Sequence, residues 1–274
     1  HNIASGSVEQ HGIYVANSGD RPVVRNNIIY GNSGSGIQLN ADIEQGGDGI
    51  ITGALIENNI IYDNGSLGGA SLNLGGIEFS RVVNNLIYDA HSTGIALFIA
   101  NAAVVTNNTE VVNNTVITAG DGRWALRMSQ GAFNNTILNN IFYSAHGFRG
   151  AVAADADSLT GLVSDYNIYE NVFSADGGNA TMNLSAWQNL AGQDANSIIS
   201  SPNELFTNPA GADFTLLPTS PALNAGTETL APLFDILGNA RPAGGAWDIG
   251  AFERAVTTTP PQANDDEASS STLN

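Results

Sequence analysis

Residues 80–91, SRVVNNLIYDAH, are one copy of a pattern that recurs along much of the chain. Each copy has two or three aliphatic residues, a pair of asparagines, two or three further apolar residues and then a turn. The other clear copies are PVVRNNIIYGNS (22–33), ALIENNIIYDNG (54–65), TEVVNNTVITAG (109–120) and NTILNNIFYSAH (135–146). Their first asparagines, at 26, 58, 84, 113 and 139, are separated by 32, 26, 29 and 26 residues. A weaker sixth copy, GLVSDYNIYE (161–170), keeps the second asparagine as Asn167.

A second short apolar strand accompanies the copies of this pattern. These strands are GIYV (12–15), GIQL (36–39), SLNL (71–74), GIALF (94–98), ALRM (125–128) and AVAA (151–154). Repeats of this length, with short strands and no helix, are typical of a parallel β-solenoid, in which stacked coils share one core. A β-propeller is the alternative, but its blades run to about 40–45 residues and need tight hairpin turns, which are nearly absent here. The pattern therefore predicts an all-β parallel solenoid.

The paired asparagines mark the corners of this solenoid. Asparagine adopts the left-handed backbone conformation at low cost, and stacked amides of neighbouring coils can hydrogen-bond to one another. We therefore expect the pairs to be structural, stacked at one corner of the coil.

Composition excludes several classes of function. The 274 residues carry 26 acidic and eight basic side chains, none of them lysine, for a formal net charge of −18. Nucleic acids and anionic membrane surfaces are bound through clustered cations, so neither is an expected partner. No apolar run is long enough for a membrane helix, and a chain without cysteine has no disulfide framework or thiolate metal site.

The repeats resemble the right-handed parallel β-helix proteins of the pectate-lyase-like superfamily. TSPALNAGT (219–227) and DILGNARPAGGAWDIGAFE (235–253) are similar to the closing segment of secreted bacterial β-helix proteins. The resemblance implies a right-handed parallel β-helix with an irregular closing segment, located outside the cell or at its surface. Its members include polysaccharide lyases, glycoside hydrolases, epimerases of uronic-acid polymers and non-enzymatic adhesin modules.

Three regions follow from these patterns. Residues 1–180 form the β-helix, with further coils expected before residue 1, and residues 181–254 form the closing segment of the same domain. Ser185 is expected to cap a short helix ending near Gly192, which covers the flank or end of the solenoid. Asp235, Arg241, Asp248 and Glu253 are expected to form ion pairs and turn caps. Residues 255–274 are rich in Thr, Pro and Ser and indicate a linker to a further module.

Alternation along the second strands predicts which side chains face solvent. If Leu126 and Met128 point inward, then Arg127 points outward. The equivalent outward positions are occupied by Tyr14, Gln38, Asn73, Ala96 and Ala153. Because coils stack about 4.8 Å apart, this column could follow a glycan chain. Arg123 and Arg127 are the one concentration of positive charge within the repeats.

A lyase acting on a uronic-acid glycan must neutralise the substrate carboxylate, remove a proton and protonate the leaving oxygen. Without lysine, the candidates for these catalytic roles are Arg127, His11 and Tyr14. The candidate substrate-binding residues are Gln38, Asn73, Arg123 and Glu78. His91 and His146 occupy equivalent turns and are expected to be structural.

The long insertion NADIEQGGDGI (40–50) carries Asp42, Glu44 and Asp48, which are oxygen ligands of the type that Ca²⁺ prefers. Calcium is therefore the one cofactor that the sequence suggests, and a solvated acidic loop is the alternative.

Three functions stay open at this point. The first is a polysaccharide lyase or epimerase acting on a uronic-acid glycan. The second is a non-catalytic glycan-binding or structural module of a large bacterial surface protein. The third is a glycoside hydrolase using a pair of loop carboxylates, which the outward column itself does not supply. The expected partner is a polysaccharide, with no nucleic acid and no membrane insertion, and this chain is expected to be a monomer.

Overall fold

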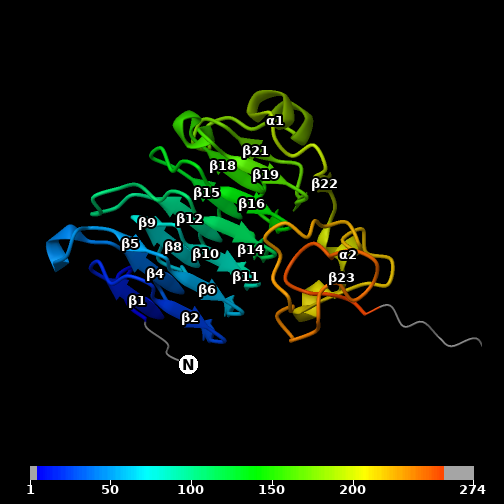
Figure 1. The fold of residues 1–274 in the computed structure, drawn as a ribbon, viewed down its shortest axis with the longest axis horizontal. Coiled ribbons are helices and arrows are strands. Elements are labelled where there is room, and N and C mark those ends of the chain that lie inside the picture. Colours follow the sequence, from blue (N-terminus) through cyan, green and yellow to red (C-terminus); the bar gives the residue numbers. More distant parts are fainter. Residues whose placement is uncertain (1–4, 256–274) are drawn as a thin grey trace, which may run out of the picture.

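A computed structural model describes residues 5–255 and shows a β-solenoid of about seven turns. The coils follow one another along the axis of the molecule, from β1 at one end to β21 at the other (Figure 1). Each full coil contributes one strand to each of three parallel sheets, called sheets A, B and C here, in the order B, C, A along the chain. The predicted all-β parallel solenoid is confirmed.

Sheet A contains the second strands predicted from the repeats. Its strands are, in spatial order, β1 (Ile13–Ala16), β4 (Ile37–Asn40), β8 (Leu72–Gly75), β12 (Ile95–Phe98), β15 (Leu126–Met128), β18 (Val152–Ala154) and β21 (Phe173–Ser174). Every pair of neighbours in it is parallel.

Sheets B and C contain the two halves of the asparagine pattern. Sheet B consists of β2 (Val23–Arg25), β6 (Leu55–Glu57), β10 (Arg81–Val83), β13 (Glu110–Val112), β16 (Thr136–Leu138) and β19 (Val163–Asp165). Sheet C consists of β3 (Ile28–Tyr30), β7 (Ile60–Tyr62), β11 (Leu86–Ala90), β14 (Thr115–Thr118), β17 (Ile141–Ser144), β20 (Ile168–Tyr169) and β22 (Ile198–Ile199). The aliphatic side chains that point inward from the three sheets form one continuous core.

The asparagine pairs lie at the corner between sheets B and C and are structural, as predicted. The first asparagine of each pair, such as Asn113 (φ 53°), has the left-handed conformation that makes the bend. The second forms a ladder of amides, buried in every coil but the first, in which each Nδ2 except the last donates to the Oδ1 of the next coil. The ladder runs through Asn27, Asn59, Asn85, Asn114, Asn140 and Asn167, with Nδ2–Oδ1 distances of 3.0, 2.9, 2.9, 3.0 and 3.1 Å.

A short helix closes the far end of the core. Helix α1 (Leu184–Ala191) ends at Gly192, where the sequence predicted its end, and Gly192 has the left-handed conformation. Its N-cap is Asn183 rather than Ser185, because the Asn183 side chain accepts the hydrogen bond from the Ala186 amide. The ring of Trp187 is buried and stacks on Phe173 of the last coil, with ring centroids 5.4 Å apart. The helix therefore covers apolar side chains that a further coil would otherwise cover.

The closing segment packs along the flank of sheets B and C (Figure 1). It includes α2 (Pro202–Leu205) and the antiparallel strands β23 (Phe206–Asn208) and β24 (Asp213–Leu216). The first asparagines of the corner hold it, since Asn113 Nδ2 donates to the Asp248 and Gly250 carbonyls. The expected ion pair is present, with 2.9 Å between Arg241 Nη1 and Glu253 Oε2, both side chains being buried.

The remaining short elements lie in the connections. They are β5 (Ile51–Thr52), which pairs with β9 (Ile77–Glu78), and the 3₁₀ turns Ile43–Gln45, Ala156–Leu159 and Pro209–Gly211. No helix in the described part of the chain is long and apolar enough to cross a membrane. The predicted linker lies, apart from Ala255, outside the described residues.

Candidate functional site

The outer face of sheet A carries the column of side chains predicted from the sequence. Strand pairing places six of these residues in one register, in the order Tyr14, Gln38, Asn73, Ala96, Arg127 and Ala153. Leu126 and Met128 are buried on the opposite side of the sheet, whereas Arg127 is half-buried. The side chain of Arg127 therefore points away from the core.

Arg127 lies in a depression of about 200 Å³ on this face. The depression spans the coils of β8, β12 and β15 and includes turns at the edge of the sheet. Its walls consist of Gly69, Ala70, Asn73, Ser92, Thr93, Ala96, Phe98, Arg123, Arg127 and Ser129. The structure thus brings together three of the predicted site residues, Asn73, Arg123 and Arg127.

Neither arginine of the depression has an anionic partner in the described part of the chain. The ion pairs of the other arginines join Arg25 to Glu57, Arg81 to Glu110 and Arg241 to Glu253. The Nε of Arg127 is buried and makes no hydrogen bond within residues 5–255. A buried donor without a partner costs about 1–3 kcal/mol, so this guanidinium is suited to an acceptor from outside the chain.

Gln38 and Asn73 continue the column toward the N-terminal end. Asn73 Nδ2 donates to Gln38 Oε1 at 2.9 Å, and Ser35 Oγ donates to the same oxygen at 3.3 Å. These two bonds occupy the side-chain oxygen of Gln38, while the Gln38 Nε2 has no partner among the described residues. The two side chains therefore present a fixed, polar surface next to the depression.

Tyr14 and His11 lie at the far N-terminal end of the column, away from Arg127. Four coil spacings separate Tyr14 from Arg127, which is about 19 Å at about 4.8 Å per coil. The three residues predicted to share one catalytic centre are therefore not gathered, and one glycosidic bond cannot lie within reach of all of them.

His11 has a structural environment in the first coil. Its Nδ1 accepts a hydrogen bond from the Ser35 amide at 2.9 Å, and its ring lies edge-on to Tyr14 with centroids 5.3 Å apart. Burial lowers the pKa of His11, although Glu9 acts in the opposite direction. The neutral ring therefore carries its proton on Nε2, and its acceptor nitrogen is already occupied.

Ala153, predicted to face solvent, is fully buried. The loop after β21 returns across the sheet, and a β-carbon on Gly178 would lie 2.9 Å from Nε1 of Trp124, just before β15. We infer that this loop closes the column at its C-terminal end.

Glu78 lies outside the depression. It ends β9 in the small sheet that continues from sheet A, and its Oε1 accepts a hydrogen bond from Thr52 Oγ1 at 3.3 Å. Its predicted role as a substrate-binding residue would require a glycan that extends beyond sheet A.

The predicted calcium ligands do not converge. Asp42 is buried and its Oδ1 accepts from the Glu44 amide, and Asp48 Oδ1 accepts from the Ile50 amide, at 2.9 and 3.0 Å. These carboxylates cap turns of their own loop. Within residues 5–255, carboxylate and imidazole groups gather in a set of three at another place, formed by Asp63, Asp89 and His91.

A larger hollow of about 650 Å³ lies at the N-terminal end of the solenoid. Gly12, Ile29 and Tyr62 are among its walls. It opens onto the first coil, where no described coil covers the inward side chains. Its lining combines isoleucine, asparagine and tyrosine side chains and includes no charged group, so we assign the candidate site to the smaller, arginine-lined depression.

The sequence from residue 1 to residue 185 matches the family model described as "Right handed beta helix region", which covers more than half of the 274 residues. The chain belongs to this right-handed β-helix family. No curated protein sequence matches it.

Two solved structures share the β-helix fold. One, "Crystal structure of pectate lyase Pel9A", is 15% identical, with a TM-score of 0.51 over 92% of this chain and 69% of that one. The other, described as "Glycoside hydrolase", is 14% identical, with a TM-score of 0.51 over 68% of this chain. The match covers only 37% of the length of that hydrolase. At these identities the likeness establishes the fold.

The turns between sheets C and A contain a set of possible metal ligands that was not predicted from the sequence. Asp63 and Asp89 occupy the same repeat position, in IIYDNG and LIYDAH, and His91 follows in the second of these turns. Alignment of the repeats could have found the two aspartates, because equal positions stack in a solenoid. Asp121 also contacts His91, but it comes from a repeat with no aspartate at the aligned position.

Proposed function

We propose that the outer face of sheet A binds a polysaccharide containing uronic acid, with Arg127 binding a sugar carboxylate. The observation that carries this proposal is the guanidinium of Arg127, which is half-buried in the depression without an anionic partner in the described chain. A guanidinium can donate two parallel hydrogen bonds to one carboxylate.

The negative charge of the whole protein supports a role for this pair of arginines in binding an anion. A chain with a net charge of −18 repels polyanions unless positive charge is concentrated locally. Arg123 and Arg127 provide such a concentration, and both line the same depression. Asn73, Ser92 and Thr93 add polar groups for sugar hydroxyls.

The glycan is expected to run across the strands, along the solenoid axis. Gln38 and Asn73 continue the polar column from the depression toward Tyr14, whose ring is 49% exposed. An aromatic side chain at this end could pack against a sugar ring. An extracellular or cell-surface location belongs to the same proposal, as it does for the superfamily that the sequence resembles.

Non-catalytic binding fits this geometry better than hydrolysis. The residues that line the depression include no carboxylate, so the pair of acids that a glycoside hydrolase needs is not found there. The same lining includes no histidine and no tyrosine.

A lyase or epimerase is the second candidate, and the presence of two arginines favours it. One guanidinium could neutralise the uronate carboxylate while the other faces the proton at C5. Arginine is a poor base because its guanidinium holds its proton strongly. Removal of the C5 proton would therefore depend on substrate contacts that lower the barrier to this proton transfer.

Binding of polygalacturonate and of its methyl-esterified form, measured by calorimetry, tests the proposal. The charged polymer should bind more tightly, and Arg127→Ala should weaken its binding by about 1–3 kcal/mol, or roughly five- to 150-fold. Arg25→Ala is the matched control, because it removes the same charge from sheet B, away from the depression. Equal binding of both polymers, or equal effects of both substitutions, would contradict the assigned role of Arg127.

Ultraviolet absorbance of the unsaturated product separates the two candidates. Steady product formation that Arg127→Ala abolishes would establish the lyase. Binding without product would establish a non-catalytic module.

A further inference from the structure

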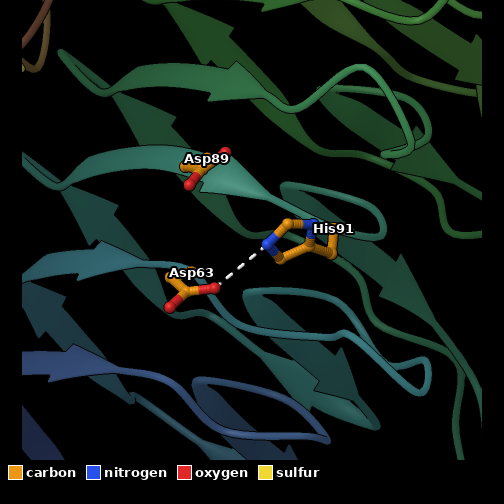
Figure 2. A group of neighbouring side chains, drawn as sticks. All are labelled: Asp63, Asp89 and His91. Carbon is orange, nitrogen blue, oxygen red and sulfur yellow. Dashed lines mark hydrogen bonds and ion pairs between the residues drawn. The ribbon is translucent and has the colours of Figure 1, made fainter.

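A cluster of metal-ligating side chains lies in the turns that lead from sheet C to sheet A. Asp63, Asp89 and His91 each direct one ligand atom toward the others, and these atoms all lie within 4.8 Å of one another (Figure 2). Asp63 follows β7, and Asp89 and His91 belong to the next coil, at the end of β11. Two neighbouring coils therefore supply the donor set, which contains one imidazole nitrogen and two carboxylates.

His91 is held in a fixed orientation by two carboxylates. Its Nδ1 lies 2.9 and 3.0 Å from the two oxygens of Asp121, and its Nε2 lies 3.0 Å from Asp63 Oδ1. In protein metal sites, a ligating histidine commonly donates its other ring N–H to such a carboxylate, which fixes the tautomer. Asp121 occupies this outer position, which leaves Nε2 as the nitrogen that faces the cluster.

The backbone fixes the two aspartates at equivalent positions in adjacent coils. Asp63 (φ 52°) and Asp89 (φ 50°) are both left-handed, and the Asp63 amide donates to the Asp89 carbonyl at 3.1 Å. The carboxylate of Asp89 accepts no hydrogen bond from the described residues. It is exposed, as is Asp63, so both can be reached from solvent.

The charges of the cluster are unbalanced without a cation. Three carboxylates, those of Asp63, Asp89 and Asp121, surround one imidazole, and in residues 5–255 no arginine lies within ion-pair distance of them. With the imidazole neutral, as it is when Nε2 binds a metal, the set carries three negative charges. A divalent cation would cancel two of them.

We propose that Asp63, Asp89 and His91 bind a divalent transition metal ion such as Zn²⁺, with Asp121 as the outer partner of His91. A mixed nitrogen and oxygen donor set suits zinc, whereas Ca²⁺ and Mg²⁺ prefer oxygen ligands alone. On binding, the metal takes the place of any proton on Nε2, which is released to solvent. Because the ligands come from two coils, the ion would link these coils together.

This site is distinct from the depression that contains Arg127, although the chain connects them. Ser92 and Thr93, which follow His91 directly, line the depression, and the Arg123 amide donates to the Ser92 carbonyl at 2.9 Å. The proposal does not depend on glycan binding, and the zinc titration below contains no glycan.

Calorimetric titration of Zn²⁺ into chelator-treated protein tests the site, with Co²⁺ absorption as a second measurement of the donor set. We expect one ion per chain, and a loss of affinity of at least about tenfold in Asp89→Asn and in His91→Ala. Asp121→Asn should weaken binding about ten- to 100-fold, as an outer partner does. Asp89→Asn retains the fold, since the Asp89 carboxylate makes no hydrogen bond in the described structure.

Two control variants should bind Zn²⁺ as the unmodified chain does. His146→Ala removes the histidine of an equivalent turn, whose Nδ1 accepts from the Phe148 and Arg149 amides. Asp48→Asn removes one acid from the loop at 40–50. Absence of Zn²⁺ binding, binding that survives in Asp89→Asn and His91→Ala, or an equal loss in the controls would each overturn the proposal.

Discussion

Removal of one amide from the middle of the asparagine ladder should destabilise the whole solenoid. Asn114 is fully buried, and its Nδ2 donates to the Val82 and Val112 carbonyls and to Asn140 Oδ1. Its Oδ1 accepts from both the backbone amide and Nδ2 of Asn85, each at 2.9 Å. The substitution Asn114→Ala removes all five bonds.

The cost follows from what each partner retains. Asn85 Nδ2 still donates to the Ile56 carbonyl, and Asn140 Oδ1 still accepts from the Asn114 amide. The backbone N–H of Asn85 loses its acceptor, and a buried N–H without a partner costs about 1–3 kcal/mol. With roughly 1 kcal/mol for each of the other bonds that is not replaced, Asn114→Ala should lower the free energy of unfolding by about 3–5 kcal/mol.

Asn27→Ala is the matched control at the end of the same ladder. Asn27 Nδ2 donates to Asn59 Oδ1 and to the Arg25 carbonyl, but no described residue donates to Asn27 Oδ1. Asn59 Oδ1 also keeps the Asn27 backbone amide as a donor. The control should therefore cost no more than about 1.5 kcal/mol.

Urea unfolding, followed by the fluorescence of the buried tryptophans, measures both variants. A loss of 3–5 kcal/mol corresponds to a fall of roughly 6–20 °C in melting temperature for a domain of this size. If Asn114→Ala shifted the transition no more than Asn27→Ala, the ladder would not stabilise the stack and this reasoning would be refuted.

Two further predictions concern ionisable groups, one half-buried and one buried. Burial raises the pKa of Glu170 to about 7, above its ordinary 4.5, although the Ser144 amide acts in the opposite direction. The folded state therefore binds the extra proton, so stability should fall as pH rises from about 4.5 to about 7, and Glu170→Gln should remove this dependence in melting curves at pH 5 and 8. Arg241→Leu should cost about 3–5 kcal/mol in denaturant unfolding, because it leaves the Glu253 carboxylate buried without its cation. An unchanged transition would show that the closing segment relaxes around Glu253.

Repetition in the sequence determined the solenoid and the direction of most side chains. A coil of this length cannot bury its apolar face alone, so equal positions must stack, and alternation along each strand then assigns one side to the core. This is why the asparagine corner, six of the seven strands of sheet A and the outward direction of Arg127 could all be predicted from local patterns.

Tertiary structure alone decided which outward residues meet. Tyr14 and Arg127 share a column, yet the number of coils between them keeps them apart, and the return of the loop after β21 accompanies the burial of Ala153. The loop at 40–50 is held from two coils away, where the Ile43 amide donates to the Asn101 carbonyl, and Asp42 and Asp48 cap turns within the loop. Loops have no repeat to fix their paths, so their contacts across coils determine where their side chains lie.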